Sequence, residues 1–473
     1  MRAKTTHGPR VELGTRKKSR WPMVAVPVLL SVPVGTLALW VGLRTGDPAQ
    51  VEVRPSLPAI GPRTPITIKL RESRRGLVAV EIDLVQGGTV TRLDARSYVA
   101  QRAWAPWDPK VSEAELQVVV GKALQPLLMP GEAEIRVTAH RAHTWMRSPA
   151  PTVHRQPMQV QLQAPKVRIL SFNTFVAQGG SEAVVYQLER EVPKEGVKAG
   201  RWWFPGYPLP GGGPLDRFAL FAAPYDQDDA KDIRLVVADE LGNEAQVEFI
   251  DKFKPRPFRN DTIPVSDKLM NTVVPAISAQ TAGFRDRGNL VANYVAINSE
   301  VRLENNARLE ALVERTQRRF LWDQVFVSMQ AKVISRFADR RSYMYNGVEI
   351  DRQDHLGLDL ASTQKAPVPA TNSGIVLLAE YLGIYGNCVV IDHGYGLMSL
   401  YAHLSTMDVR VGESVKRAQV VGRTGTTGMA LGDHLHFTLM LHGLPVTPIE
   451  WWDAHWIRDR LSLKLGDALP FTE

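Results

Sequence analysis

The stretch that decides the fold of the C-terminal part reads Asp433-His434-Leu435-His436-Phe437-Thr438-Leu439. Apolar and polar residues alternate along it, which is typical of a β-strand with one buried face. Because side chains two apart point to the same face of a strand, His434 and His436 lie together while the apolar residues between them fill the core. Two imidazoles on one face can both bind a metal ion, or one can bind while the other serves a reaction.

A second histidine cluster lies upstream and reads Asp354-His355-Leu356-Gly357-Leu358-Asp359-Leu360-Ala361. Its alternating leucines predict an extended segment, in which residues four apart share a face. We therefore expect His355 and Asp359 to converge on one ion, since imidazole nitrogen and carboxylate oxygen are both good zinc ligands. This spacing alone is a weak signal. Seven of the eleven histidines fall between His355 and His455, however, which concentrates the chemistry in the last 150 residues.

Two further histidines lie between these clusters, in the runs Val389-Val390-Ile391-Asp392-His393-Gly394 and Ser399-Leu400-Tyr401-Ala402-His403-Leu404. His393 stands beside a glycine turn and is predicted to be structural, whereas His403 ends a strand and is the better candidate for chemistry. The glycine-rich segment from Gly422 to Gly432 has no Gly-Lys-Ser/Thr sequence, so it is not a phosphate loop. We expect a turn that lets backbone approach a groove.

Cysteine usage limits the metal chemistry. Cys388 is the only cysteine in the chain, which excludes an intrachain disulfide framework and a multi-cysteine zinc site. Any zinc must be held by histidine, aspartate and glutamate.

Several of these motifs, in this order, resemble the signatures of the lysostaphin/LytM-type zinc metallopeptidases, the peptidoglycan endopeptidases with a duplicated hybrid motif. The resemblance covers about residues 330–455. Beyond the two metal-type clusters and Tyr401-Ala402-His403-Leu404, it includes Tyr385-Gly386-Asn387 and Pro445-Val446-Thr447-Pro448-Ile449-Glu450-Trp451-Trp452. Ser335-Arg336-Phe337-Ala338-Asp339-Arg340 resembles the family's first motif, with Ala338 where the family usually has glycine. We expect that departure to change the local geometry only slightly.

The resemblance implies a set of roles. His355, Asp359 and His436 would hold Zn2+, and His403 and His434 would be the unligated pair that accepts a proton and stabilises the oxyanion. Ligation needs neutral imidazole, so activity should fall below about pH 6.5. The implied fold is a small antiparallel β-sheet that forms a groove.

The implied function is hydrolysis of peptide cross-links in bacterial cell-wall peptidoglycan by a zinc metalloendopeptidase. Two alternatives stay open. One is a catalytically silent family member that acts as an envelope scaffold or as an activator of another wall hydrolase. The other is a protease directed at proteins or peptides.

The N-terminal residues predict a membrane anchor. The chain has 473 residues and a formal charge of +8, but six of these charges lie within residues 1–20, so the charge does not point to nucleic acid. Residues 21–43 carry no charge, and as a helix they would be about 34 Å long, enough to cross a bilayer. The basic tail should stay in the cytoplasm, with the catalytic domain periplasmic or otherwise extracytoplasmic. A cleaved signal peptide is the alternative.

The remainder predicts a mostly β protein. Short alternating strands between turn formers indicate two β-sandwich (immunoglobulin-like) modules, through which envelope protein partners are possible. A helix is predicted from about Leu290 to Arg319, where it could mask the catalytic domain. The expected parts are a basic cytoplasmic tail (1–20), a transmembrane anchor (21–43), two β modules (51–165 and 166–250), a linker with the helix (251–325), the metallopeptidase domain (326–458) and a C-terminal tail (459–473).

Overall fold

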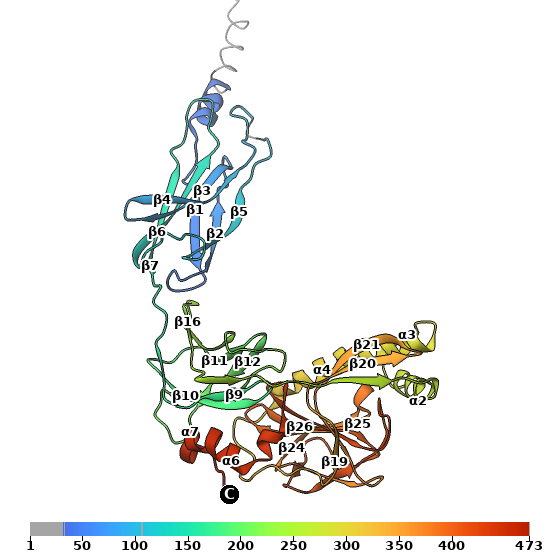
Figure 1. The fold of residues 1–473 in the computed structure, drawn as a ribbon. Coiled ribbons are helices and arrows are strands. Elements are labelled where there is room, and N and C mark those ends of the chain that lie inside the picture. The colour runs from blue at the N-terminus through green and yellow to red at the C-terminus, as the bar shows by residue number, and fades with distance from the viewer. Residues whose placement is uncertain (1–31, 33, 106, 473) are drawn as a thin grey trace, which may run out of the picture. The chain divides into compact units, whose positions relative to one another are not determined.

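The computed structural model describes residues 32, 34–105 and 107–472, and its fold is mostly β (Figure 1). The chain divides into two compact units, Met1–Leu162 and Gln163–Glu473. Most of the predicted anchor, residues 21–43, lies outside the described residues, although residues 34–43 are helical. Among the described residues, no helix is both long and apolar enough to cross a membrane.

The first unit consists of two antiparallel sheets that share one hydrophobic core. The sheet orders are β1-β2-β5 and β4-β3-β6-β7. Ile66 and Ile68 of the first sheet are fully buried against Val80, Ile82 and their neighbours in the second. Short strands separated by turns, which the alternating pattern predicts for this part of the chain, are present. The strands are β1 (Gln50–Pro55), β2 (Thr64–Arg71), β3 (Leu77–Gln86), β4 (Thr89–Ser97), β5 (Glu113–Val120), β6 (Gly131–Arg141) and β7 (Thr152–Val160).

The second unit begins with another pair of sheets, ordered β13-β14-β10-β8 and β12-β11-β15-β16. Strands β10 and β14 are buried on both faces, because the C-terminal sheet and the C-terminal helices cover the face turned away from the partner sheet. The strands are β8 (Val167–Ile169), β9 (Phe175–Ala177), β10 (Ser181–Leu188), β11 (Lys194–Ala199), β12 (Trp202–Pro205), β13 (Tyr207–Pro208), β14 (Asp216–Ala222), β15 (Ile233–Ala238) and β16 (Glu244–Val247).

The following segment combines edge strands with helices. The predicted helix at 290–319 is found as a continuous helical run from Leu290 to Arg315, with a π-helical turn in its middle. Helix α2 was not predicted; Ser266 caps it by accepting from the Leu269 backbone N–H, as capping serines do. The elements are β17 (Lys252–Lys254), β18 (Asn260–Pro264), α2 (Asp267–Ser278), α3 (Leu290–Ala296), η1 (Ile297–Val301), α4 (Arg302–Ala311) and η2 (Leu312–Arg315).

An eight-stranded antiparallel sheet forms the centre of the C-terminal region, with the path β19-β22-β30-β26-β25-β24-β28 and β31 beside β30. A small sheet, β18-β20-β21, flanks it. The strands are β19 (Lys332–Ser335), β20 (Asp339–Tyr345), β21 (Val348–His355), β22 (Leu358–Ala361), β23 (Pro367–Pro369), β24 (Gly374–Tyr381), β25 (Asn387–Gly394), β26 (Leu397–Leu404), β27 (Thr406–Met407), β28 (Ser414–Val415), β29 (Val420–Arg423), β30 (Leu435–Leu441) and β31 (Leu444–Val446), with a 3-10 turn, η3 (Gly383–Tyr385).

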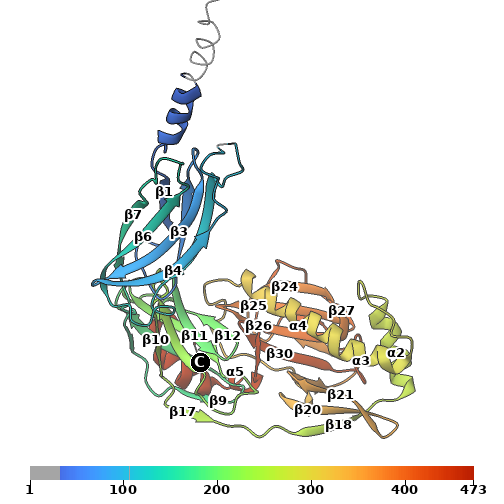
Figure 2. The same ribbon diagram turned by 90° about the horizontal axis from the view of Figure 1, so that it is seen from above.

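The two faces of this sheet differ in what covers them. One face packs Leu358, Leu435 and Phe437 into the core that it shares with the second pair of sheets. On the other face, helix α4 lies over β24, β25 and β26 and buries Leu309 against Leu400 and its neighbours (Figure 2). Strands β22 and β30 lie beyond this helix on the same face, and they carry the candidate site.

Short helices close the chain and pack against the second pair of sheets. Lys464 forms an ion pair with Glu182 of β10 at 2.9 Å, and both side chains are almost fully buried. Glu450 likewise accepts hydrogen bonds from Arg256 and from the Ser181 backbone N–H. The helices are α5 (Pro448–Trp451), α6 (Ala454–Ile457), η4 (Arg458–Ser462), α7 (Leu463–Leu465) and η5 (Gly466–Ala468).

The buried Glu182–Lys464 pair gives a stability prediction. Lys464→Met removes one partner and leaves an uncompensated buried carboxylate, so we expect a loss of about 3–5 kcal/mol in the free energy of unfolding of the second unit. The double change Glu182→Leu with Lys464→Met should recover most of that loss. Urea unfolding followed by tryptophan fluorescence measures both variants.

The matched control is Lys194→Met, which breaks the exposed Lys194–Glu244 pair and should cost less than about 1 kcal/mol. Equal losses for the buried and the exposed lysine would contradict the prediction.

Candidate metal centre and active site

Three side-chain atoms converge at one point between β21, β22 and β30. His355 Nε2 lies 2.9 Å from Asp359 Oδ1 and 3.0 Å from His436 Nδ1. His436 Nδ1 lies 2.9 Å from the same Asp359 oxygen. All three residues are buried, and they form a group that could hold a metal ion.

Strand register brings Asp359 and His436 together, because they are direct partners in the antiparallel pair of β22 and β30. His355 reaches them by a different route from the one the sequence predicts. In a continuous strand, residues four apart would be about 13 Å apart. The chain instead leaves β21 at His355, turns at Leu356 and Gly357, and enters β22 in a different sheet. The prediction of one extended segment is therefore wrong, although the convergence it predicts is present.

Hydrogen bonds on the outer side of each group orient it. His355 Nδ1 is 2.9 Å from the Arg336 carbonyl oxygen, so we assign the proton to Nδ1 and the lone pair to Nε2. His436 Nε2 is 3.0 Å from Thr438 Oγ1, whose hydroxyl donates to the Leu356 carbonyl, so Nδ1 carries the lone pair. The second carboxylate oxygen of Asp359 accepts from Arg341 Nη2 at 2.8 Å.

This network fits a cation of borderline softness. With the outer atoms committed to protein partners, His355 Nε2, His436 Nδ1 and Asp359 Oδ1 all present lone pairs to one another. Such atoms repel unless a positive charge lies between them, and two imidazole nitrogens with one carboxylate oxygen are a donor set typical of catalytic zinc.

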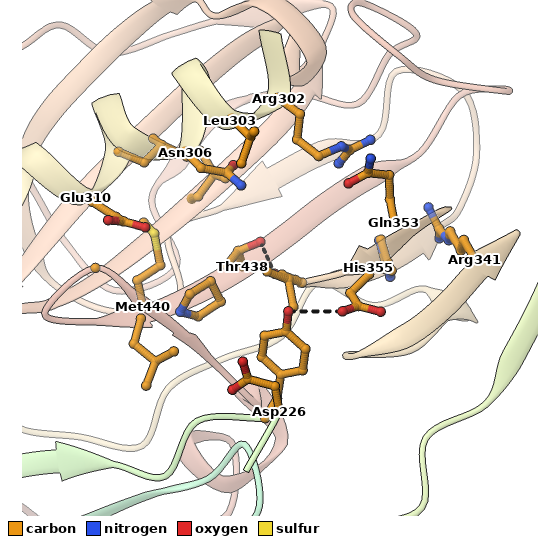
Figure 3. Close-up of a pocket in the computed structure, with 18 of the residues that line it drawn as sticks. Asp226, Arg302, Leu303, Asn306, Glu310, Arg341, Gln353, His355, Thr438 and Met440 are labelled. Atoms are coloured by element: carbon orange, nitrogen blue, oxygen red, sulfur yellow. Dashed lines mark hydrogen bonds between the residues drawn. The ribbon is translucent and has the colours of Figure 1, made fainter. Parts of the chain in front are cut away.

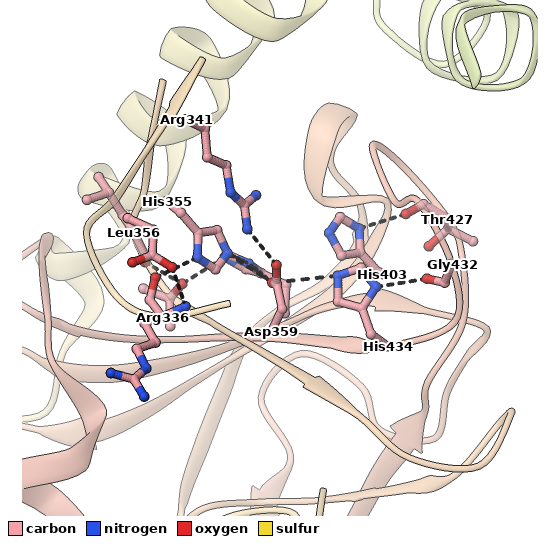
Figure 4. Close-up of polar contacts among 12 residues, drawn as sticks. Arg336, Arg341, His355, Leu356, Asp359, His403, Thr427, Gly432 and His434 are labelled. Atoms are coloured by element: carbon pink, nitrogen blue, oxygen red, sulfur yellow. Dashed lines mark hydrogen bonds and ion pairs between the residues drawn. The ribbon is translucent and has the colours of Figure 1, made fainter. Parts of the chain in front are cut away.

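His403 and His434 lie beside this group (Figure 4). Their ring centroids are 4.9 Å apart, and His434 Nε2 is 3.5 Å from Asp359 Oδ1. His403 Nδ1 is 2.8 Å from the Thr427 carbonyl oxygen, and His434 Nδ1 is 2.8 Å from that of Gly432. Both rings are thus held through Nδ1, and Nε2 of His434 faces the Asp359 carboxylate.

His403 adopts a left-handed backbone conformation, with φ of +61°. Residues of β26 alternate between the core and the site face, so an ordinary strand residue at this position would point into the core beside Tyr401. The positive φ at the strand end turns the imidazole to the site face. Strained backbone of this kind is concentrated at functional sites.

Burial and neighbouring charges set the protonation of the site. Burial alone would raise the pKa of Asp359, but the surrounding imidazoles, above all that of His355, outweigh it and hold the pKa well below its usual range. Burial lowers the pKa of His436 to about 4 and that of His403 well below its usual value. For His434, burial lowers the pKa, but Asp359 outweighs it and the net shift is upward.

Two cavities adjoin the site. The larger, of about 720 Å³, is lined by His355, His436, Thr438 and Met440 of the C-terminal region and by Arg302 and Glu310 of the helix (Figure 3). Its far wall includes Trp202 and Tyr225 from the second pair of sheets. The smaller, of about 320 Å³, is lined by residues that include Asp359, His403 and His434. Residues of the metal-type group thus line both cavities.

The other predicted residues have structural places. His393 is fully buried, with Nδ1 beside the Ser373 carbonyl and Nε2 beside the Ser399 hydroxyl, as a structural histidine should be. In the glycine segment, Gly428 has φ of +71°, and a side chain there would meet the backbone of Gly386. This agrees with a tight turn. Ala338 also has positive φ, +61°, which explains why glycine suits that position.

Sequence reasoning missed the residues that orient the site. Arg341 contacts Asp359, which lies 18 residues further along the chain. Thr438 contacts His436, two residues before it. Alternation along β30 places Thr438 on the face of His436, so a hydroxyl at that spacing was a usable signal. No sequence signal indicated Arg341, because it depends on how a separate small sheet packs.

Residues 353–448 match the model of Peptidase family M23. The DD-carboxypeptidase/endopeptidase Mpg of Neisseria meningitidis is 33% identical over 132 residues, 28% of this chain and 30% of that protein. The peptidoglycan DD-endopeptidase ShyA of Vibrio cholerae is 38% identical over 96 residues, 20% of this chain and 22% of that protein. The matched region thus spans less than a third of these curated relatives.

Among solved structures, the match to a putative peptidase M23 from Pseudomonas aeruginosa covers 59% of this chain and 95% of that protein's chain, with 21% identity and a TM-score of 0.37. The match to the catalytic domain of lysostaphin from Staphylococcus simulans covers 30% of this chain and 94% of that chain, with 23% identity and a TM-score of 0.20. The C-terminal part of the chain contains a Peptidase family M23 domain.

Gly357 offers a test of the site geometry. A Cβ atom there would lie 2.7 Å from the His436 ring and from the Phe437 carbonyl oxygen, so Gly357→Ala must displace the imidazole. We expect at least a tenfold loss of metal affinity, comparable to the loss of an orienting partner, measured by competition with a chromogenic chelator.

Gly432→Ala is the matched control, because a Cβ atom there meets nothing within 4 Å and φ is not positive. The predicted geometry is wrong if both alanine variants hold metal as tightly as the unchanged chain.

Proposed function

We propose that this protein is a zinc metalloendopeptidase that hydrolyses peptide cross-links of bacterial peptidoglycan. The observation that carries the proposal is the convergence of His355 Nε2, Asp359 Oδ1 and His436 Nδ1 within 3.0 Å of one another. Two acceptor imidazoles, those of His403 and His434, stand directly beside it. The M23 match adds independent support for a peptidase.

Zinc is the metal we assign to this group. Its two imidazole nitrogens and one carboxylate oxygen match the three-ligand pattern of catalytic zinc sites. Zinc bound there supplies a Lewis acid that polarises the carbonyl group under attack and makes water a stronger acid. Arg341 keeps Asp359 oriented through its second oxygen, and Thr438 keeps Nδ1 of His436 free.

The unligated histidines handle the protons. His403 and His434 each donate Nδ1–H to a backbone carbonyl, so each directs Nε2 toward the site. One of them, neutral and with its lone pair on Nε2, accepts the proton that the attacking water loses and later returns it to the leaving amine. The other, protonated on both nitrogens, donates a hydrogen bond from Nε2 to the oxyanion that develops on the carbonyl oxygen.

Cross-linked wall peptide is the substrate class that the comparisons favour. The relatives carry the names peptidoglycan DD-endopeptidase and DD-carboxypeptidase/endopeptidase. In this chain, two cavities of about 720 and 320 Å³ adjoin the metal-type group and leave room for a peptide substrate.

The proposal predicts that substitutions at the five site residues fall into two classes. Alanine at His355, Asp359 or His436 should abolish both bound zinc and release of peptides from purified sacculi. Alanine at His403 or His434 should leave zinc bound while lowering the rate by about 10²–10⁴-fold, the usual range for general acid–base groups. Zinc content by mass spectrometry and chromatography of released muropeptides measure the two properties.

His455→Ala is the matched control, since His455 is an exposed histidine of the same region and should change neither property. If the zinc-loaded chain releases no peptides and His436→Ala has no effect in cells, the protein is instead a silent scaffold or activator. Cleavage of soluble proteins but not of sacculi would indicate a protease of the other class.

We also propose that residues 21–43 anchor the protein in the cytoplasmic membrane with residues from 44 onward outside. This uncharged run follows a strongly basic tail, as in a membrane segment whose N-terminus stays inside.

Deletion of residues 1–43 tests the anchor. We expect the full chain to stay with membranes after washing in alkaline carbonate and the deleted chain to be released. Mass spectrometry of the purified full chain distinguishes the alternative, because a cleaved signal peptide would leave a mature protein that starts after the apolar run.

A further inference from the structure

Three tryptophans are exposed at one end of the first unit. Strand directions bring the loops 72–76, 98–112 and 142–151 together there, since β3, β5 and β7 start and β4 and β6 end at these loops. Trp104 and Trp107 in one loop are 60% and 73% exposed, and Trp145 in another is 52% exposed. Soluble surfaces rarely show such a cluster unless it binds something. We call this end the tryptophan platform.

Internal contacts hold the platform in shape. Arg75 is buried and donates from Nη2 to the His143 carbonyl at 2.8 Å and to that of Arg102 at 3.4 Å, so one side chain joins all three loops. Lys110 donates to the Ser73 and Arg74 carbonyls. Trp104 and Trp107 pack edge to face with centroids 6.3 Å apart. The tryptophans are therefore presented by a built surface.

The platform touches the helix of residues 34–43. The Trp145 ring lies directly against Gly42, where an added Cβ would be 2.6 Å from it. Thr144 also donates its hydroxyl to the Gly42 carbonyl. Figures 1 and 2 both show this helix leaving the same end of the first unit at which the loops gather. Residues 44–49 alone separate the helix from β1, a span of at most about 21 Å.

The charged side chains of the platform are mostly basic. Five are exposed and positive: Arg44, Arg74, Arg102, Lys110 and Arg147. Only Asp47 and Asp108 oppose them outside the buried Glu72. The Arg102 guanidinium lies over Trp104 at 4.5 Å. Tryptophan beside arginine and lysine is the composition of protein surfaces at the interface of an anionic bilayer.

We propose that the tryptophan platform rests on the anionic lipid surface of the membrane, with Trp104, Trp107 and Trp145 at headgroup depth and the exposed guanidinium groups of Arg44, Arg74 and Arg147 on lipid phosphates. The inference depends on the anchor part of the proposed function, because residues 34–43, the described part of the predicted anchor, join the unit at this end. A glycan would also stack on tryptophan, but contact with the membrane-entering helix favours lipid. Such a contact fixes how the first unit stands on the bilayer.

Quenching by brominated lipids tests the platform in the full chain. The chain is reconstituted into vesicles of phosphatidylcholine and phosphatidylglycerol with brominated acyl chains, with Trp21→Phe and Trp40→Phe to silence the predicted span. We expect part of the tryptophan fluorescence to be quenched, and the combined change Trp104→Phe, Trp107→Phe and Trp145→Phe to remove at least two thirds of the quenched fraction. Vesicles of phosphatidylcholine alone should quench less.

The control changes three tryptophans of the second unit, Trp202, Trp203 and Trp452, to phenylalanine and should leave the quenched fraction unchanged. The inference is overturned if the variant with all three platform tryptophans changed is quenched as fully as its parent. It is also overturned if the three platform substitutions abolish binding to purified sacculi while the quenched fraction stays the same. Retention after the carbonate wash reports the anchor separately, and peptide release from sacculi reports the peptidase. A platform failure therefore leaves both of those results in place.

Discussion

The register between β22 and β30 is the constraint on which the site depends. Leu358 and Leu360 pack into the core opposite Phe437 and Leu435, and this packing leaves Asp359 and His436 paired on the other face. A slip of one residue would put the carboxylate and the imidazole into the core and the leucines into the cavity. Hydrophobic burial thus sets the position of two metal-type ligands, although neither ligand contributes to that burial.

The site is costly to the fold without a cation. It gathers an ionised carboxylate and four imidazoles in a buried volume, with three lone pairs facing one point. Every outer atom of this group has a protein partner, so rotation of a ring or of the carboxylate would break a buried hydrogen bond. The strained backbone at His403 and Ala338 lies at the margins of the same region. Strained backbone and buried charge both lower stability. A sequence that retains both in one place is typical of a region selected for a functional site and not for stability.

Much of this was predictable, and the reasons are specific. Strands such as β2 and β6 alternate apolar and polar residues because one face is buried, and period-two patterns report that directly. The five candidate site residues were predicted because their motifs resemble a known family and because alternation places His434 and His436 on one face of a strand. Strand β10 does not alternate between apolar and polar residues, because both of its faces are covered. Which elements cover the second face is visible only in the tertiary structure.

What sequence could not supply is contact between distant segments. The turn at Leu356 and Gly357, which places His355 beside His436, depends on β21 joining β18 and β20 in a separate sheet. Arg341 reaches Asp359 from that same sheet. The bond between Asn298 of the helix and Asp351 of β21 also ties the helical segment to it.

The second pair of sheets and the C-terminal sheet share one core. Each part would therefore lose buried contacts if it were separated from the other. Phe218 of β14 packs against Tyr395 with centroids 5.0 Å apart and against Phe320 of the preceding segment. Trp322 and Phe326 are buried in the same core, so a chain cut near residue 325 would lose aromatic packing as well as a connector. Trp202 and Tyr225 of the same sheets also line the larger cavity beside the metal-type group. One pair of sheets therefore both completes the core of the C-terminal region and forms part of the cavity wall, so substitutions made there to alter the cavity also act on a structural element that the core requires.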